Sequence, residues 1–496
     1  MRIVKGLAWL AALLAAAAVG GCGDESSPAP DPHLITNATV EKNDKIDLTC
    51  FVSWTTPEPS SSAVEFGEAT DGSSASYSFV TEDATLATEH RMLVVGMHAS
   101  TLVHLRAVSQ SPSGMVYSSN DLTYTTGALP EHLTDATLET PATAEAFDGW
   151  TVVTLAAGIL GTSMLTLQPD TTYPPTGVIF DQQGRVVWYD VHNLSFNGVA
   201  DYLPDRTLLF ASQHVMFQTP TPSALIVDLA GTTQWQGPPQ PVNVPVEGIY
   251  HHEFRKMPNG HWLTLRATIQ NQIVGDVAVE LDEAGNEVWT WSSFDHLPPA
   301  DTTGWSGIGY FDWTHMNALA YDEADDTVLA SARNLDAVFK IDRASGDILW
   351  QLGHNGDMTM LSSNDTPWFL KAHALERLPD GTLIMLDNGD VTERPWSRVI
   401  IYRVDDAAKT AEIVWEYRGA TPWAAYYWGD ADLLPNGNYF VSAGNWDQGR
   451  TSFMFEVTPG EHKVWELDFG THNGSTIGMY DGARFAPPVR RLTAAP

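Results

Sequence analysis

The chain has few cysteines and few basic residues for its length of 496 residues. Cys22 and Cys50 are its two cysteines, and their wide separation excludes a redox site built from neighbouring cysteines. Lys and Arg number 26 against 61 Asp and Glu, which gives a formal net charge of -35. This acidity argues against nucleic acid as a partner and is typical of a well-solvated protein outside the cytoplasm. If such a protein handles an anion, its few cations must gather at the site.

The apolar run near the N-terminus is too short for a typical membrane span. Leu7–Val19 follows two basic residues, as in a secretory signal, and leads into Val-Gly-Gly-Cys, which resembles a bacterial lipobox. We therefore predict a lipoprotein signal peptide over residues 1–21. Lipidation of Cys22 would anchor the protein in the cell envelope, on a periplasmic or outer-membrane surface. Ordinary cleavage near the same place is the alternative. With Cys22 lipidated, Cys50 has no partner for an intrachain disulfide.

Residues 22–34 are rich in Ser, Pro and acidic residues and are predicted to be a tether. Residues 35–128 contain about seven short predicted strands separated by turn residues, a spacing typical of a small β-sandwich. Val52–Thr55 and Val103–Val108 resemble core strands of fibronectin type III-like domains. This domain contains no group of residues with evident catalytic chemistry, so we expect it to serve in docking or as a spacer.

The rest of the chain, residues 129–496, lacks a convincing helical pattern and repeats a strand ending instead. Asp-x-x-Gly-x-x-x-Trp occurs at Asp181–Trp188 and Asp282–Trp289, and one residue longer at Asp342–Trp350. With looser copies, the tryptophans recur every 47 to 65 residues. This period is typical of the blades of a β-propeller.

The hairpins predict five complete blades, and the two ends of this region predict a sixth. The five lie at residues 193–236, 247–292, 312–352, 371–418 and 426–467. Residues 151–189 and 474–488 together supply the sixth, which closes the ring and removes its exposed edge. The predicted fold is therefore all-β, a six-bladed β-propeller preceded by the small sandwich.

Three of the predicted first strands carry a histidine at a similar place. The first strand of each propeller blade lines the central channel, and these strands carry His252, His315 and His373. His252 and His373 each lie six residues before the proline of their hairpin turn, so they share a register. One histidine at a hairpin end is more often a simple polar residue than a functional one. Three at one level of the channel are hard to explain by packing and indicate a functional site.

The hairpins also bring charged residues towards these histidines. Folding each hairpin about its turn sets Arg266, Arg333 and Asp387 opposite the first, second and third histidine, although the strand pleat can shift a pairing by one residue. A carboxylate beside an imidazole fixes its tautomer and makes the outer nitrogen a better nucleophile or base. Arginine forks suit a tetrahedral oxyanion.

Together these motifs resemble a known family, the bacterial arylsulfate sulfotransferases. The motifs are His251–Glu253 before a Pro-Asn-Gly turn, Trp313–Asn317, Ser331–Arg333 followed by Lys340–Asp342, and His373 with its Pro-Asp-Gly turn and Asp387–Gly389. The resemblance covers most of residues 151–488 and implies a six-bladed propeller with an N-terminal sandwich. It also implies sulfuryl transfer from a phenolic sulfate ester to a phenol acceptor, without a nucleotide donor, other cofactor or metal.

By this resemblance, His373 matches the histidine that is transiently sulfated. Ala372 departs from the family, in which a residue such as Gln precedes the nucleophile. The lack of a cysteine pair also departs from periplasmic members that can form a disulfide, so the oligomeric state stays open. The predicted catalytic residues are His373, His315, His252 and Arg333, and the predicted substrate contacts are Asn317, Arg266 and Asp387.

Two other functions stay open on the sequence alone. A channel rich in histidine can hold a divalent metal for hydrolysis or lyase chemistry, but arginines beside the histidines would repel the cation. A non-catalytic surface propeller used for binding or scaffolding is the second, because the repeat also occurs in quinone-cofactor dehydrogenases and in outer-membrane assembly propellers. Such a scaffold would leave the histidines and arginines without a purpose.

Overall fold

The structure is a computed structural model that describes residues 33–68, 77–157, 174–191, 198–212, 221–242, 246–299, 310–444, 451–472 and 475–492. Cys22 and the predicted signal peptide lie outside the described residues. Nearly all elements are strands, with one short helix, α1 (Ser293–His296), and one 3-10 turn, η1 (Arg333–Leu335). Within the described ranges no helix is long and apolar enough to cross a membrane. The predicted all-β class is confirmed.

The N-terminal domain is built on an eight-stranded sheet. Its strands are β1 (Leu34–Ile35), β2 (Thr39–Lys42), β3 (Cys50–Glu68), β4 (Phe79–Val94), β5 (Leu102–Gln110), β6 (Val116–Ser119), β7 (Leu122–Thr125) and, from the far end of the chain, β37 (Arg490–Arg491). β3 and β4 are far longer than the predicted short strands and pair along most of their length. Alternate residues of β3, such as Val52, Trp54 and Val64, are buried in the domain core. The fibronectin III-like packing stays a prediction.

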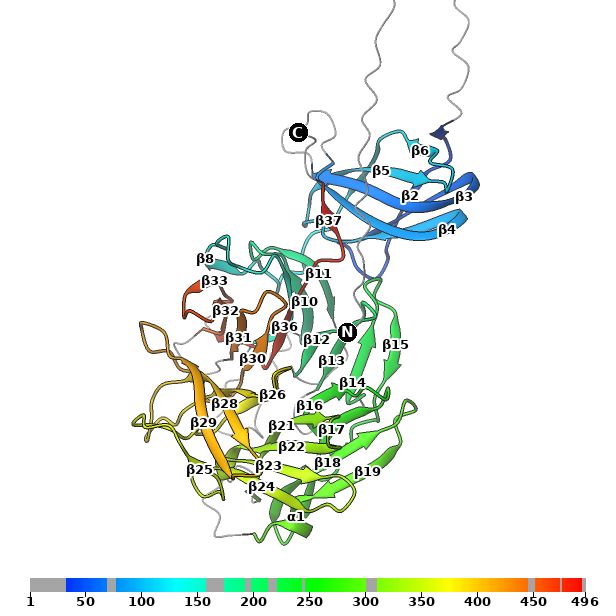
Figure 1. Ribbon diagram of the computed structural model, residues 1–496. Helices are drawn as coiled ribbons and strands as arrows, with labels where there is room; N and C mark the ends of the chain where they lie inside the picture. The colour runs from blue at the N-terminus through cyan, green and yellow to red at the C-terminus, as the bar shows by residue number, and fades with distance from the viewer. Residues whose placement is uncertain are drawn as a thin grey trace, which may run out of the picture.

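Six further sheets form the blades of the propeller, numbered here in chain order (Figure 1). Blade 1 contains β9 (Trp150–Ala157), β10 (Thr176–Phe180), β11 (Val186–Val191), β34 (Thr471–His472), β35 (Ser475–Gly478) and β36 (Gly482–Phe485). Blade 2 contains β12 (Ala200–Tyr202), β13 (Leu208–Ala211), β14 (Ala224–Val227) and β15 (Thr233–Gln236). Blade 3 contains β16 (Tyr250–Lys256), β17 (Trp262–Gln270), β18 (Ile273–Leu281), β19 (Glu287–Ser292) and β20 (Phe311–Asp312).

The remaining blades follow the same plan. Blade 4 contains β21 (Met316–Asp322), β22 (Thr327–Ala332), β23 (Ala337–Asp342) and β24 (Ile348–Gly353). Blade 5 contains β25 (Thr359–Met360), β26 (His373–Arg377), β27 (Leu383–Asp387), β28 (Arg398–Asp405) and β29 (Thr410–Tyr417). Blade 6 contains β30 (Asp430–Leu433), β31 (Tyr439–Ala443), β32 (Phe453–Val457), β33 (Lys463–Asp468) and β8 (Thr137–Thr140).

Both ends of the propeller region close the ring. β35 and β36 pair antiparallel with β9, with Ile477 opposite Ala157 and Phe485 opposite Trp150. The strands from the C-terminal end therefore lie on the inner side of blade 1. At the other end, β8 adds to the outer strand of blade 6. The six blades and their closure by segments from both ends confirm the predicted architecture.

The tryptophan of the repeated strand ending joins five of the six blades to a neighbouring blade. In blade 1 the Asp181 carboxylate accepts backbone N–H groups of its turn, Gly184 supplies a φ of +80°, and the Trp188 indole donates to the Leu229 carbonyl of blade 2. The same indole bond joins Trp235 to Glu283, Trp289 to Arg343, Trp415 to Pro459 and Trp465 to Gln182. The buried Trp350 indole of blade 4 has no hydrogen-bond partner among the described residues. The motif thus specifies blade-to-blade contacts as well as turns.

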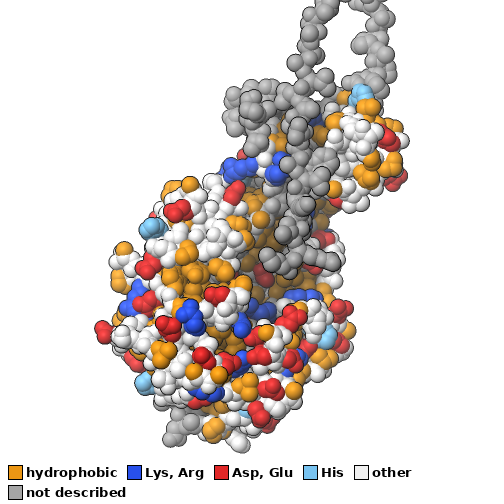
Figure 2. Space-filling model, in the orientation of Figure 1, with side chains coloured by type: hydrophobic (Ala, Val, Ile, Leu, Met, Phe, Trp, Pro, Cys, Tyr) orange, Lys and Arg blue, Asp and Glu red, His pale blue; other side chains and the backbone are white. Residues whose placement is uncertain are grey.

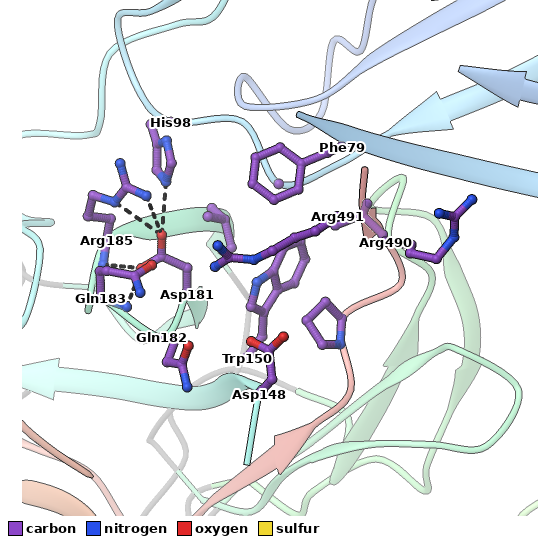
Figure 3. Close-up of a pocket in the computed structure, with 14 residues that line it drawn as sticks. Phe79, His98, Asp148, Trp150, Asp181, Gln182, Gln183, Arg185, Arg490 and Arg491 are labelled. Carbon is purple, nitrogen blue, oxygen red and sulfur yellow. Dashed lines mark hydrogen bonds and ion pairs between the residues drawn. The ribbon is translucent and has the colours of Figure 1, made fainter. Parts of the chain in front are cut away.

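The C-terminal segment also joins the propeller to the N-terminal domain. β37 extends the sheet at the edge of β4, and a pocket of about 560 Å³ lies at the junction (Figure 3). His98 from the N-terminal domain lies between two carboxylates there. Its Nδ1 bonds to Glu68 of its own domain, and its Nε2 is 3.0 Å from Asp181 of blade 1. Arg185 binds the same Asp181 carboxylate. An ionic chain therefore crosses the domain junction.

The strong negative charge is distributed over the surface. On the face shown in Figure 2, acidic side chains are spread over the blades, with Lys and Arg among them. No single acidic patch stands out on this face. This agrees with a role of the charge in solvation.

Candidate active site

The inner strands of the blades bring a group of aromatic side chains together in the channel. β16, β21, β26 and β30 contact one another in turn, and β12 contacts β36. The His252 and His315 rings lie 4.9 Å apart between centroids. Tyr480, between β35 and β36, lies 5.5 Å from His252 and 6.1 Å from His373. All three predicted histidines thus share one site, and a tyrosine from the C-terminal strands completes it.

The inner strands carry irregular backbone where these side chains lie. The pairing of β16 shifts between His251 and Phe254, that of β21 between Met316 and Ala318, and that of β26 between His373 and Glu376. His252, His315 and Ala374 have φ values of 60°, 45° and 57°. Each left-handed residue costs about 1–2 kcal/mol, and bulges of this kind re-aim side chains. Their recurrence in three successive blades indicates that the site, rather than packing, requires them.

The geometry around His373 defines which ring nitrogen is reactive. His373 Nδ1 lies 2.8 Å from Asn388 Oδ1. The Asn388 amide N–H groups donate to the carbonyls of Ala425 and Trp428, so the amide oxygen must face the histidine. Nδ1 of His373 therefore carries the proton, and Nε2 carries the lone pair. Nε2 is buried and has no hydrogen-bond partner among the described residues. Such a nitrogen is available as a nucleophile.

The electrostatic surroundings keep His373 neutral. Burial lowers its pKa well below the ordinary value of 6.5, and the positive charge of Arg333 lowers it further. His315 acts in the same direction, and the hydrogen bond to Asn388 opposes the shift. A neutral imidazole keeps its lone pair at physiological pH.

The predicted pairing of His373 with Asp387 is wrong by one residue. The bulge in β26 places Leu386 opposite His373 in the ladder. The Asp387 carboxylate accepts the Leu370 N–H at 2.9 Å and binds Arg394 and Arg398. Asp387 therefore fixes the chain just before His373, and Asn388 orients the ring.

Arg333 and His315 occupy the positions expected from their hairpin. The Arg333 N–H donates to the His315 carbonyl at 3.1 Å, so the two residues lie opposite each other. The Arg333 guanidinium donates to the Tyr426 carbonyl at 3.2 Å, and His315 Nδ1 lies 2.5 Å from Asp312 Oδ2. Burial lowers the pKa of Arg333, and the nearby Asp312 and Asp336 oppose this shift. The site therefore holds a half-buried cation beside a neutral histidine.

Asn317 holds the backbone next to His373. Its amide donates to the Ala372 carbonyl at 2.8 Å, directly before His373. Its Oδ1 is buried and has no partner within the described ranges. The predicted contact of Asn317 with substrate stays a prediction.

Arg266 lies away from the histidines, contrary to the expected pairing with His252. The bulge in β16 sets Arg266 opposite Tyr250. Its guanidinium lies 2.9 Å from Glu287 on the outer strand of the blade. The predicted pairing is thus wrong by two residues, and the ion pair with Glu287 engages the arginine.

Tyr480 and Asn388 were not predicted from the sequence. Burial raises the pKa of Tyr480 well above 10, so it remains a phenol at neutral pH, and its hydroxyl donates to the Asn317 carbonyl at 3.4 Å. Tyr480 belongs to the segment that closes blade 1, and aligning that segment with the other inner strands would have found it. Asn388 is adjacent to the predicted Asp387, and only the bulge reveals it.

Further along the channel, towards the hairpin turns, lies a group of carboxyls, of which Glu253 is buried and the others are half-buried. Burial raises the pKa of Glu253, Glu376, Asp432 and Asp481 above the ordinary values, and Arg255 lies among them. The raised pKa values favour the neutral forms of these groups, and a neutral carboxyl adds no negative charge next to the histidines. In the part of the chain that the structure describes, no three or more His, Cys, Asp or Glu are arranged to hold a metal ion.

Comparison with known proteins assigns the propeller to a family. Residues 150–480 match the family described as Arylsulfotransferase (ASST). The chain belongs to this family. The arylsulfotransferase match begins in β9 and ends at Tyr480, so it contains every residue of the site.

The individual proteins that this chain matches are distant in sequence. Arylsulfate sulfotransferase AssT of Escherichia coli is 28% identical over 136 residues, which cover 21% of this chain and 23% of that protein. The chain thus aligns with about a quarter of this curated relative. Among solved structures, a candidate 6-phosphogluconolactonase of Bacteroides uniformis is 15% identical, with 66% of this chain and 84% of that chain covered and a TM-score of 0.40. An auxiliary nutrient binding protein of Bacteroides ovatus is 9% identical, with 92% of both chains covered and a TM-score of 0.34.

Proposed function

We propose that this protein transfers a sulfuryl group from an aryl sulfate ester to a phenol acceptor through a sulfohistidine at His373. The observation that carries this proposal is the buried Nε2 of His373. It holds a lone pair, has no hydrogen-bond partner among the described residues, and belongs to a ring close to the Arg333 cation. Membership of the arylsulfotransferase family supports aryl sulfate transfer. The mechanism uses neither a nucleotide donor nor another cofactor.

The proposed reaction has two balanced halves. In the first, Nε2 of His373 forms a bond to sulfur as the bond between sulfur and the aryl oxygen breaks, and a second histidine protonates the departing phenolate. In the second, the acceptor phenol loses its proton to that group as its oxygen attacks sulfur and the N–S bond breaks. Arg333 and His315 stabilise the three sulfuryl oxygens, as in loose phosphoryl transfer, where positioning and fixed charge dominate catalysis.

The sulfohistidine can be trapped directly. Purified protein is mixed with 4-nitrophenyl sulfate alone and quenched at alkaline pH, because the N–S bond is acid-labile. Mass spectrometry should find one sulfuryl group on the peptide that contains His373. His373→Asn should abolish the label, whereas His354→Asn, at an exposed position away from the channel, should retain it.

Steady-state kinetics give a second test. Varying the donor and a phenol acceptor together should give parallel double-reciprocal lines. Intersecting lines, or substantial turnover by His373→Asn, would point to direct transfer between two bound phenols. No turnover with any aryl sulfate would favour a non-catalytic propeller.

We also propose that Cys22 carries a lipid anchor that holds the enzyme in the cell envelope. The support is the short apolar run followed by Val-Gly-Gly-Cys and a Ser- and Pro-rich segment. Mass spectrometry of the mature N-terminus should find acylated Cys22, and Cys22→Ser should release the protein into the soluble fraction. An unmodified mature N-terminus at another residue would contradict the anchor.

A further inference from the structure

A second chain of polar contacts ends at His252. His251 Nδ1 and His252 Nδ1 lie 2.7 Å apart, with the two rings perpendicular at 88°. His251 Nε2 lies 3.2 Å from Asp276 Oδ1, at the centre of β18. All three side chains are buried. The direct contact between two histidine nitrogens requires one of them to donate and the other to accept.

The carboxylate at one end determines the direction of every bond in this chain. Burial alone would raise the pKa of Asp276, but hydrogen bonds from His251, Thr314 and Met316 lower it. An ionised carboxylate only accepts, so Nε2 of His251 carries the proton that faces Asp276, and whenever the ring of His251 holds a single proton its Nδ1 accepts from His252. Nδ1 of His252 must then donate, and the lone pair of neutral His252 falls on Nε2.

We propose that Asp276 and His251 are positioning residues that make Nε2 of His252 the atom that gives and receives the phenol proton, an inference that rests on the proposed sulfuryl transfer. The donor half-reaction starts with His252 protonated on both nitrogens, and its Nε2 proton passes to the phenolate oxygen as the bond from that oxygen to sulfur breaks, which leaves the lone pair on Nε2. In the acceptor half-reaction, the incoming phenol returns a proton to Nε2 as its oxygen bonds to sulfur. The Nδ1–H of His252 is unchanged in both half-reactions. The contacts that lead from His252 through His251 to Asp276 therefore keep the same donors and acceptors throughout.

The charge balance favours His252 over His315 as this proton carrier. The other contacts of Asp276 within the described ranges are neutral donors, the Thr314 hydroxyl at 2.5 Å and the Met316 N–H at 2.6 Å. Its negative charge is therefore balanced when His252 holds an extra proton. Asp312, the partner of His315, is already close to the Arg333 cation.

Asp276 acts on His252 through His251. The titratable groups that face or adjoin His252 in the described residues include His251, His315, Tyr480 and Glu253, with Asp312 and Arg333 behind His315. Burial raises the pKa of both Tyr480 and Glu253, which favours their neutral forms.

Asp276→Asn tests this relay, the chain of contacts from Asp276 through His251 to His252, because the substitution should reverse the tautomers of both histidines. Thr314 and Met316 both donate to Oδ2, so the asparagine must place its oxygen there and its amide N–H towards His251. His251 Nε2 then accepts, its Nδ1 donates, and His252 becomes protonated on Nε2. Nitrogen-15 NMR of histidine-labelled protein should show His252 changing from the Nδ1–H to the Nε2–H form. An unchanged tautomer in a folded variant would overturn the relay, whatever the enzyme does.

The kinetic test compares donors with good and poor leaving groups. Phenol has a pKa of about 10 and needs a proton as it leaves, whereas the more acidic 4-nitrophenol needs it less. Single-turnover sulfation of His373 in Asp276→Asn should fall on the order of a hundredfold more with phenyl sulfate than with 4-nitrophenyl sulfate. Equal losses with both donors would overturn the proposal.

Two matched variants separate this effect from simple disturbance of the site. Asp312→Asn changes the carboxylate of His315, and Thr314→Val removes another bond to Asp276 without reversing the tautomers. Both should slow the two donors equally. A loss that depends on the leaving group in Asp312→Asn would assign the proton to His315 instead.

His251 supplies a test if Asp276→Asn does not fold. His251→Gln can still donate to Asp276 and accept from His252, so it should retain most activity with phenyl sulfate. His251→Leu should lose it. Equal loss in the two variants would contradict a positioning role. If the wild type transfers no sulfuryl group at all, the proposed function fails, while the NMR tautomers still report on the relay.

Discussion

At the scale of single residues, the site combines a neutral nucleophile with a fixed positive charge. Burial lowers the pKa of His373, and the charge of Arg333 lowers it further. In the proposed reaction, the same cation both favours the unprotonated imidazole and stabilises the transferred sulfuryl group. This double use requires a group that keeps its charge in a buried site, which favours arginine over lysine.

Arg333→Lys should lower kcat/KM roughly a hundredfold, on the order of 3 kcal/mol, because the lysine lacks the guanidinium fork. Arg333→Met should do so and should also move the acid limb of the pH–rate profile to higher pH. The sign follows because a nearby cation disfavours protonated His373, and its removal raises the pKa of that histidine. A lysine variant with full activity would show that net charge alone is sufficient.

At the scale of elements, the repeated tryptophan bonds make the blades mutually dependent. Trp188 and Trp350 form a natural pair for measuring this bond, since both rings are buried but only the Trp188 indole has a partner in the described residues. Trp188→Phe should destabilise the protein by about 1 kcal/mol more than Trp350→Phe, because it leaves the Leu229 carbonyl without its donor. Thermal unfolding of both variants checks this. Equal unfolding midpoints in the two variants would show that the tryptophans stabilise the blades by packing alone.

The sequence predicted the blades well because their boundaries depend on local chemistry. The aspartate, glycine and tryptophan of each repeat act within one turn or on the adjacent blade, so their spacing is visible along the chain. The residue pairings in the channel were predicted less well. The prediction that Arg333 lies opposite His315 is correct. The predicted partner of His373 is wrong by one residue, and the predicted partner of Arg266 is wrong by two. Each error results from a bulge beside a functional histidine, and a bulge leaves no repeated pattern in sequence.

Tyr480 escaped prediction for a different reason. It is distant in sequence from the histidines, and only closure of the ring brings it to His252 and His373. A local reading of hairpins cannot find such a residue, because its position depends on the number of blades and the order in which they close.

At the scale of the whole molecule, the domain junction should respond to pH through His98. Burial alone would lower the pKa of His98, but bonds to Asp181 and Glu68 raise it from 6.5 to about 9. A raised pKa means that this contribution to stability is complete below about pH 6.5 and is lost as the pH rises through about 9. The lowered pKa values of Glu68 and Asp181 add stability above their ordinary values of 4.5 and 3.8, which is lost in acid. The junction should be most stable between about pH 4.5 and 6.5.

Thermal unfolding from pH 5 to 10 tests this expectation. His98→Gln should lower the midpoint most near pH 6 and have progressively less effect above pH 9, where the wild-type histidine has lost its charge. His104→Gln is the control, because His104 pairs with Asp121 inside the N-terminal domain and does not cross the junction. A loss in His98→Gln that is equal at all pH values would argue against the ionic chain.

The closure of blade 1 by β35 and β36 determines when the site is first complete during synthesis of the chain. These strands are the last of the propeller to leave the ribosome, and Tyr480 lies between them. A nascent chain can pair the hairpins of the middle blades as they emerge, but its channel stays open on one side until the final segment arrives. The proposed sulfuryl transfer therefore requires that synthesis of the propeller is complete. A chain whose synthesis has stopped before residue 475 carries all three histidines without a finished site around them.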